Sequence, residues 1–292
     1  MYLGKWRDSA PPTLVKSTTY ANSTRQGRVC VPRNCQSQVK ALLLGAACAS
    51  LLAACGGDDD NFDDRTGTVD PVSRFVHAVR GGPELTLRRN GSAEPTATNV
   101  AYKYGSQYHD IDTSSTTFSL RRASDGTELA NAVINPNRGH KYTVVALPAV
   151  TGFELMVIDD PFDKSLTSDD TRLRVLNAAP NAQTFDVYLT ATNADLAAAT
   201  PRYTGVSYKE MAPASGADST AIEDGSYRLR ITPEGSKTVI FDANVSVPDN
   251  GDWLLIVLPS DAVPVATNAI KVLRVRSDGS SDATDELETA QP

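Results

Sequence analysis

An internal repeat is the feature that most limits the folds open to this chain of 292 residues. Residues 74–78, Arg-Phe-Val-His-Ala, recur as residues 174–178, Arg-Val-Leu-Asn-Ala, and residues 145–148, Val-Ala-Leu-Pro, recur as residues 256–259, Ile-Val-Leu-Pro. The spacing between copies grows along the chain, as it does when loops of one duplicated fold acquire insertions. The repeat therefore predicts two consecutive units of about 100 residues each.

Apolar residues alternate with polar ones inside each copy, which is the pattern of β-strands with one buried face. The pattern holds over residues 185–189 and 227–232. In residues 237–247 the odd positions are apolar from Val239 onward, and Ile240 is the exception on the polar face. Asn-Gly and Asp-Gly pairs separate the segments, as in β-turns. We therefore expect an all-β chain of two tandem antiparallel β-sandwich domains of immunoglobulin-like architecture.

An uncharged run from Ala41 to Ala54 precedes the repeat and ends at Gly-Gly-Asp-Asp-Asp. It is too short to cross a membrane, which takes about 20 apolar residues. It has the length of the apolar core of a secretory signal, with Arg33 and Lys40 as the positive flank. A start at Val31 would give a signal of ordinary length. The first 54 residues therefore read as a leader and signal peptide.

The end of this signal, Leu52-Ala53-Ala54-Cys55, resembles the lipobox of bacterial lipoprotein precursors. The resemblance implies cleavage before Cys55 and acylation of its thiol and its new amino terminus, which together anchor a chain firmly. Cys48 lacks a leucine three positions before it and is not expected to be modified. The alternative is a chance match inside an ordinary secretion signal.

Removal of the signal changes the charge of the chain. The first 54 residues hold seven Lys and Arg and one acid, so the remainder has 21 basic and 34 acidic residues, a formal charge of −13. Binding to nucleic acid through a basic face is not expected. All four cysteines, Cys30, Cys35, Cys48 and Cys55, lie at or before the cleavage point, so the exported part has no free thiol for catalysis, metal binding or disulfides.

Motifs of both copies follow one order. In the second copy they are Arg174 to Pro180, Phe185-Asp186-Val187-Tyr188 and Gly225 to Gly235, and in the first they are Arg74 to Ala78 and Lys141 to Val145. This order is similar to that of the bacterial domain-of-unknown-function family 4397 (DUF 4397) over roughly residues 71–276. The first copy departs from it where Glu84-Leu85-Thr86-Leu87 replaces the Asp-Val-Tyr strand. The resemblance implies an envelope lipoprotein with sandwich domains, often in tandem, and carries over no catalytic residue.

The predicted organisation has six parts. They are a leader and lipoprotein signal peptide (1–54), an acidic tether (55–70), a first β-sandwich domain (71–158), a linker (159–170), a second β-sandwich domain (171–276) and a disordered acidic tail (277–292). We expect the two sandwiches to fold as separate units.

The remaining chemistry favours structural roles. His77 corresponds to Asn177 in the second copy, so a shared polar strand position is favoured over a ligand, and His109 and His140 are scattered. Trp253 lies in an apolar strand and is expected in the core. The acids of residues 58–64 and 159–170 lack the spacing of a calcium loop and are expected to be solvated. We expect no catalytic residue, no metal site and no cofactor.

The sequence thus favours a lipid-anchored protein of the cell envelope with a non-catalytic, interaction or structural function. Its partners would be the membrane, through Cys55, and an unidentified protein or glycan. Gly56, rather than Asp, after the cysteine favours the outer membrane of a diderm bacterium. One alternative is a carboxylate-dependent carbohydrate hydrolase, which needs two converging acids about 5 to 10 Å apart. The other is a calcium-dependent adhesion module.

Overall fold

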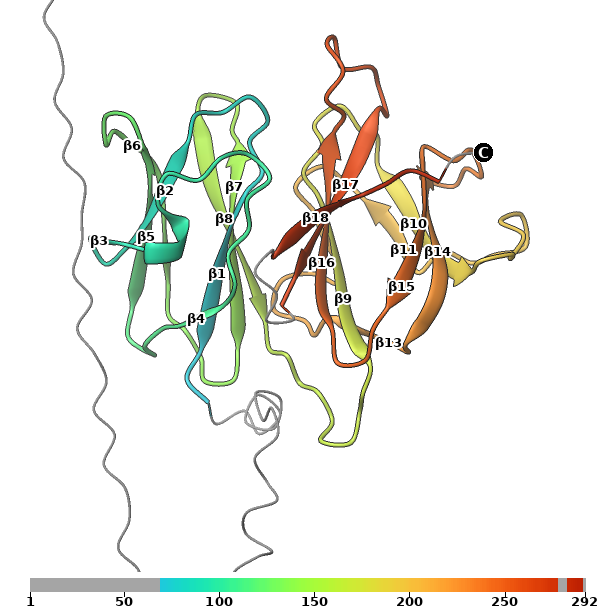
Figure 1. The fold of residues 1–292 in the computed structure, drawn as a ribbon, viewed down its shortest axis with the longest axis horizontal. Helices are drawn as coiled ribbons and strands as arrows, with labels where there is room; N and C mark the ends of the chain where they lie inside the picture. The colour runs from blue at the N-terminus through green and yellow to red at the C-terminus, as the bar shows by residue number, and fades with distance from the viewer. Residues whose placement is uncertain (1–68, 278–282, 291–292) are drawn as a thin grey trace, which may run out of the picture. The chain divides into compact units, whose positions relative to one another are not determined.

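The computed structural model describes residues 69–277 and 283–290, which form an all-β fold with no α-helix (Figure 1). This confirms the predicted fold class. The first half of the described chain contains β1 (Val72–His77), β2 (Leu85–Arg89), β3 (Ser92–Ala93), the 3₁₀ helix η2 (Pro95–Ala97), β4 (His109–Asp110), β5 (Thr116–Arg122), β6 (Glu128–Ile134), β7 (Lys141–Pro148) and β8 (Phe153–Asp160). The second half contains β9 (Thr171–Asn177), β10 (Phe185–Ala191), β11 (Tyr203–Val206), β12 (Met211–Ala212), β13 (Thr220–Ile222), β14 (Gly225–Pro233), β15 (Phe241–Val247), β16 (Asp252–Pro259), β17 (Ile270–Arg276) and β18 (Thr284–Leu287).

Each half is a sandwich of two sheets. In the first half an outer sheet of order β3-β2-β5-β6 faces a central sheet of order β4-β1-β7-β8. In the second half an outer sheet of order β11-β10-β14-β15 faces a central sheet of order β12-β9-β16-β17-β18, with β13 also paired to β9. Large apolar side chains fill each sandwich, among them Phe75 and Phe118 in the first and Phe185 and Trp253 in the second. The position predicted for Trp253 is thereby confirmed.

The two central sheets are built alike, and one pairing in each is parallel. β1 runs parallel to β7, and β9 runs parallel to β16, whereas the other pairings are antiparallel. Both β7 and β16 are buried along almost their whole length. A strand buried on both faces needs apolar side chains at successive positions. This explains the unbroken apolar runs of residues 144–147 and 253–258, which do not alternate.

A third apolar cluster lies between the two central sheets, and we call it the central layer. Both halves contribute to it, so the two sandwiches share buried surface. Its buried members are Val76, Ala78, Val145, Leu147, Ile158, Leu176, Ala178, Leu254, Ile256, Leu258, Leu273 and Val275. That the two predicted domains fold independently stays a prediction. A half separated from the other would expose its side chains of the central layer to solvent.

The disorder expected for the tail is wrong for residues 283–290, and the predicted linker is packed at its start. The tail of residues 277–292 holds strand β18, which pairs with β17 through side chains of opposite charge. The linker of residues 159–170 is packed at its start, because Asp160 ends β8 and Phe162 and Lys164 are buried. Charged segments are thus ordered where their side chains pair with residues of opposite charge.

The strand predicted over residues 237–247 is shorter than expected. β15 begins at Phe241, Val239 is exposed, and Ile240 packs against the second core. The main-chain N–H of Ile240 donates to the carbonyl of Ile231 before the regular ladder begins. The one residue that broke the alternation therefore marks the point where the chain enters the sheet.

Candidate functional site

The predicted lipidation site lies outside the described residues. Cys55 and the residues Leu52, Ala53 and Ala54 precede Val69, so their assignment stays a prediction. Within residues 69–277 and 283–290 there is no helix of the length and apolar character that a membrane span requires.

His77 has a structural role at the end of β1. Its side chain is fully buried, its Nδ1 accepts from the main-chain N–H of Val79 at 3.2 Å, and its Nε2 lies 3.0 Å from the carbonyl of Pro83. An Nδ1 that accepts leaves Nε2 to donate, so the ring is neutral. Burial lowers the pKa of His77, because the charged form would lose its hydration.

Asn177 makes the same pair of contacts in the second half. Its Oδ1 accepts from the N–H of Ala179 at 3.1 Å, and its Nδ2 donates to the carbonyl of Val206 at 3.1 Å. A short side chain with one acceptor and one donor satisfies the chain where it leaves the central sheet. The prediction of a shared polar strand position is confirmed.

The other two histidines lie apart from each other. His109 Nε2 lies 2.7 Å from the hydroxyl of Thr96, and His140 Nδ1 lies 2.7 Å from a carboxylate oxygen of Asp159. In the part of the chain that the structure describes, no three His, Cys, Asp or Glu residues come together as metal ligands.

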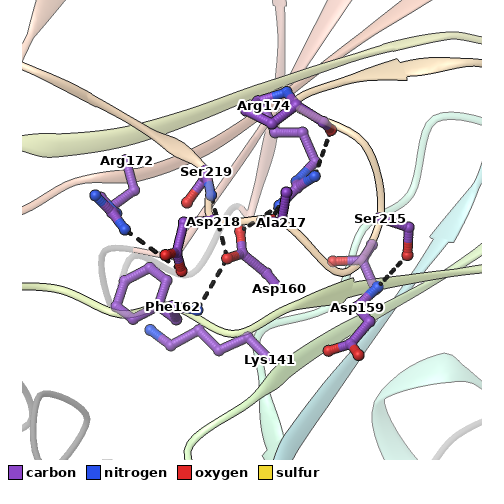
Figure 2. A network of polar contacts seen from close by, with 12 residues as sticks. Lys141, Asp159, Asp160, Phe162, Arg172, Arg174, Ser215, Ala217, Asp218 and Ser219 are labelled. Carbon is purple, nitrogen blue, oxygen red and sulfur yellow. Dashed lines mark hydrogen bonds and ion pairs between the residues drawn. The ribbon is translucent and has the colours of Figure 1, made fainter.

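The acidic segment after β8 joins a charged network between the halves (Figure 2). Asp160 Oδ2 lies 3.1 Å from Nη2 of Arg174, and its Oδ1 accepts from the N–H groups of Phe162 and Ser219 at 3.0 and 3.3 Å. Arg174 also donates to the carbonyls of Ala214 at 2.7 Å and Ala217 at 2.5 Å. The carboxylate is therefore fully engaged, so it has no oxygen free for calcium.

Arg172 and Lys141 make the remaining contacts of the network, with residues that follow Asp160 and with Asp218. Arg172 donates to the carbonyl of Asp163 at 2.7 Å and lies 3.7 Å from Asp218. The ammonium of Lys141 lies 3.4 Å from the centre of the Phe162 ring, and this cation–π contact is seen in Figure 2. The adjoining cavity, between Asp160, Arg174 and residues of both central sheets, measures 10 Å³ and has room for about one water molecule. The network thus fixes the two halves and has no space for a substrate.

Buried carboxylates elsewhere are also engaged in structural contacts. Asp186 is the most informative, because its two oxygens accept from the N–H groups of Gly205 and Gly235 at 3.0 and 2.9 Å. It thereby ties two turns to β10, which explains the acid of the Asp-Val-Tyr motif. The three other buried carboxylates of the described chain are Glu94 with Arg89, Asp160 with Arg174, and Asp252, whose Oδ2 lies 3.9 Å from Lys141 and has no hydrogen-bond partner among the described residues. Three of these four buried carboxylates are thus hydrogen-bonded to structural partners.

A groove at one end of the two sandwiches is the most accessible apolar site. It measures 270 Å³ and lies where β1, β7, β9 and β16 end. Both halves supply equivalent residues to it, Ala78 with Ala178 and Pro148 with Pro259, and we call it the loop-end groove. Its other lining residues are Arg80, Pro180, Asn181 and Val265.

Exposed apolar side chains stand on two loops at this end. Val150 follows β7 and is fully exposed, and Val263 follows β16 and is 87% exposed. Arg80 donates to the carbonyls of Asp261 and Ala262 at 3.1 and 3.0 Å, which joins a loop of the first half to the loop that carries Val263. Sequence reasoning missed this site, because its residues come from four loops and only the repeated alanines and prolines could have drawn attention to them.

One family match bears on this chain. Residues 73–188 match the family described as Domain of unknown function (DUF4397). The predicted resemblance is thus confirmed for this stretch, which is less than half of the chain. The match runs from β1 into β10 and so crosses from the first half into the second.

A solved structure is similar at a low level. It is the crystal structure of CBMbc (family CBM26) from Eubacterium rectale Amy13K in complex with maltoheptaose, at 12% identity and a TM-score of 0.21. The match covers 76% of this chain and 98% of that chain, and at this TM-score it supports no inference about a site. No curated protein matches the sequence.

Proposed function

We propose that this chain is a lipid-anchored protein of the bacterial cell envelope whose folded region is a non-catalytic interaction module. The loop-end groove is the observation that carries the proposal. It is lined mainly by Ala, Pro and Val, and the exposed side chains of Val150 and Val263 stand near it. Exposed apolar surface with a polar rim is typical of protein contact sites.

A protein partner is favoured over a glycan. Every described Tyr, Phe and Trp is buried or half-buried, and the residues that line the loop-end groove are aliphatic, polar or charged. Sugar rings pack best against broad exposed aromatic faces, whereas small aliphatic surfaces suit the side chains of a protein. The contact would therefore be an apolar one, with Arg80 and Asn181 at its edge.

Cross-linking tests the groove. A photoreactive phenylalanine analogue replaces Val263 in one variant and Val239 in another, because Val239 is also exposed but lies two residues before β15 and does not line the groove. Cells that express the Val263 variant should give a discrete cross-linked band that the Val239 variant lacks. The interaction proposal would be rejected if both variants gave the same bands or none.

The anchor at Cys55 is part of the proposal and rests on Leu52-Ala53-Ala54-Cys55. Placement in the outer membrane rests on Gly56 alone. Cells are labelled with a radioactive fatty acid, and the Cys55→Ala and Cys48→Ala variants are compared. Label should vanish only in the Cys55→Ala variant, and label that persists there would exclude this anchor.

A further inference from the structure

The tail covers one edge of the second sandwich. β18 pairs antiparallel with β17, Val272 opposite Leu287 and Val275 opposite Thr284. The N–H of Ala290 then donates to the carbonyl of Asp242 in β15. The segment therefore runs from the central sheet to the outer sheet and closes that side of the sandwich (Figure 1).

Charge holds this added strand in place. Arg274 of β17 donates twice to Asp285 of β18, at 3.0 and 2.8 Å, and Lys271 lies 3.6 Å from Glu286. Lys103 of the first half also reaches Glu286, at 2.6 Å. A basic edge strand is thus capped by a short acidic strand.

β8 occupies the same place in the first sandwich as β17 in the second. Each is the hairpin partner of the buried strand, β7 or β16, so Glu154 corresponds to Lys271 and Leu155 to Val272. In the described chain β8 is the last strand of its sheet, and no strand is hydrogen-bonded to its outer edge as β18 is to β17, although β6 of the outer sheet packs against it. The two halves therefore differ in whether this edge is covered.

The outward main-chain groups of β8 can be identified from its end. The N–H of Asp159 donates to the hydroxyl of Ser215 and not to β7, while its carbonyl accepts from the N–H of Gly216. In a strand every second residue faces the same way, so Leu155 and Val157 also direct their N–H and C=O groups outward. No hydrogen bond joins these groups to another described residue.

The exposed edge is apolar. Phe153, Leu155 and Val157 are half-buried in the first core, and Val133 of β6, on the same side of the sandwich, is 61% exposed. An apolar edge strand with free main-chain groups is a template for strand addition, and proteins commonly cover such edges. The second half shows how this fold covers one.

The charge on this edge is reversed. β17 carries Lys271, Arg274 and Arg276, whereas β8 carries Glu154, Asp159 and Asp160. Glu154 lies 2.7 Å from Lys209 of the second half, and its side chain is still 36% exposed. Asp159 is already bonded to the loop of residues 213–219, which leaves Phe153 to Val157 as the open stretch. Since an acidic strand covers the basic edge, a basic strand matches the acidic one.

We propose that the β8 edge binds an extended segment of a partner protein in which apolar side chains alternate with lysine or arginine. The segment adds antiparallel to Phe153–Val157, hydrogen-bonds to the main chain of Leu155 and Val157, and places a basic side chain beside Glu154. This mode of binding is β-strand addition. The site is separate from the loop-end groove and does not depend on it.

The probe is a hexapeptide, Ala-Thr-Lys-Lys-Leu-Lys, which is the charge-reversed form of the chain's own residues 283–288, Ala-Thr-Asp-Glu-Leu-Glu. Amide hydrogen exchange is measured on the full chain with and without each peptide. The basic peptide should slow exchange at Leu155 and Val157. The acidic peptide should need at least about a tenfold higher concentration to give the same protection.

Two variants distinguish strand addition from general charge attraction. Val157→Pro removes an outward N–H but no bond to β7, so it should abolish protection while the fold is retained. Glu154→Lys gives β8 the residue that β17 has at this position, so it should reverse the preference in favour of the acidic peptide. If Val157→Pro fails to fold, the Glu154→Lys variant still tests the proposal.

Three results would overturn the proposal. One is protection by the basic peptide at β6 or β15 instead of β8, and another is no protection up to millimolar peptide. The third is that Leu155 and Val157 are already protected in the free chain and lose this protection on dilution, which would show that a second copy of the chain occupies the edge.

Discussion

The first strand of each half carries an arginine at the equivalent position, Arg74 in β1 and Arg174 in β9, but the two arginines have different partners. Arg174 donates to carbonyls of residues 213–217 and pairs with Asp160. Arg74 donates to the hydroxyl of Thr143 at 3.0 Å and stacks 4.5 Å from the ring of Tyr108, and its Nη1 has no hydrogen-bond partner among the described residues. Both side chains are 3% exposed. The two halves thus share this position in their central sheets but differ in its polar partners.

The same divergence runs through the contacts between the halves. Lys209 of the second half pairs with Glu154 of the first at 2.7 Å, whereas Lys103 of the first pairs with Asp261 and Glu286 of the second. The equivalent of Glu154 is Lys271, so Asp261 and Glu286 supply the negative charge that this position lacks. Equivalent surfaces meet each other, as in a twofold dimer, but their charged residues differ.

Separation of the halves should have the largest effect. A fragment from Thr171 to Pro292 exposes the central-layer side chains of β9, β16 and β17, including Leu254 and Ile256. Because these surfaces already meet a similar surface, we expect the fragment to fold as a self-associated dimer whose melting temperature rises with concentration. Sedimentation and thermal melting measure this.

The control for that experiment is the same fragment with Ile256→Asp, which should stay monomeric and lose stability. A wild-type fragment that is monomeric and melts cooperatively at every concentration would show that the second half is an independent domain.

The two arginines should give the next largest difference. Arg174→Met leaves Oδ2 of Asp160 and the carbonyls of Ala214 and Ala217 without their arginine donor. Breaking such a buried pair costs about 3–5 kcal/mol of unfolding free energy. Arg74→Met removes a charge with fewer bonds, and its cost should stay within about 1 kcal/mol. Denaturant unfolding of both variants measures the difference. Equal losses would mean that the pair with Asp160 does not carry the stability assigned to it.

His77 and Asn177 should differ in their response to pH. Burial lowers the pKa of His77 from 6.5, so below about pH 6.5 the unfolded chain binds a proton that the folded chain excludes. Stability should therefore fall as the pH drops, and His77→Asn should remove about 1 kcal/mol of the loss between pH 7.5 and 5.5. Denaturant unfolding at both pH values tests this, with His109→Asn as the control. An unchanged pH dependence in His77→Asn would contradict the burial argument.

The smallest effect concerns two tyrosines at equivalent positions. The hydroxyl of Tyr208 donates to the carbonyl of Pro148 at 3.2 Å, whereas the buried hydroxyl of Tyr102 has no hydrogen-bond partner in the described chain. Tyr208→Phe should cost about 1 kcal/mol, and Tyr102→Phe should be neutral or slightly stabilising. Thermal melting compares the two, and the reverse order would refute the assignment.

Much of the fold could be predicted from the sequence because strand periodicity and repetition are local signals. The sequence predicted the shared position of His77 and Asn177 and the buried Trp253. It did not predict the central layer, because alternation identifies only strands with one buried face. The unbroken apolar run of β16 is typical of a strand with two buried faces. β18 was missed because its residues are mostly polar and acidic, and because its ladder with β17 and its contacts with basic side chains depend on residues elsewhere in the chain.

The candidate sites were less predictable for a related reason. The loop-end groove takes one to three residues from each of four strand ends and the loops that follow them. The β8 edge is defined by a strand that the second half has and the first lacks among the described residues. Neither property is visible in a motif. Asp186 shows the opposite case, because the motif was visible but its role in holding two glycine N–H groups required the positions of turns far along the chain.

The parallel pairing of β1 with β7 has a consequence for the rate of folding. Arg74 of β1 and Thr143 of β7 are 69 positions apart, and the pairing of β9 with β16 is more distant still, since Arg172 lies opposite Asp252. Hairpins such as β5–β6 and β14–β15 close short loops and can form early. Each central sheet is complete only when strands far apart in the sequence have paired, which costs more loop-closure entropy. We therefore expect the outer sheets to form first and folding to take milliseconds to seconds, as it does in other domains of high contact order.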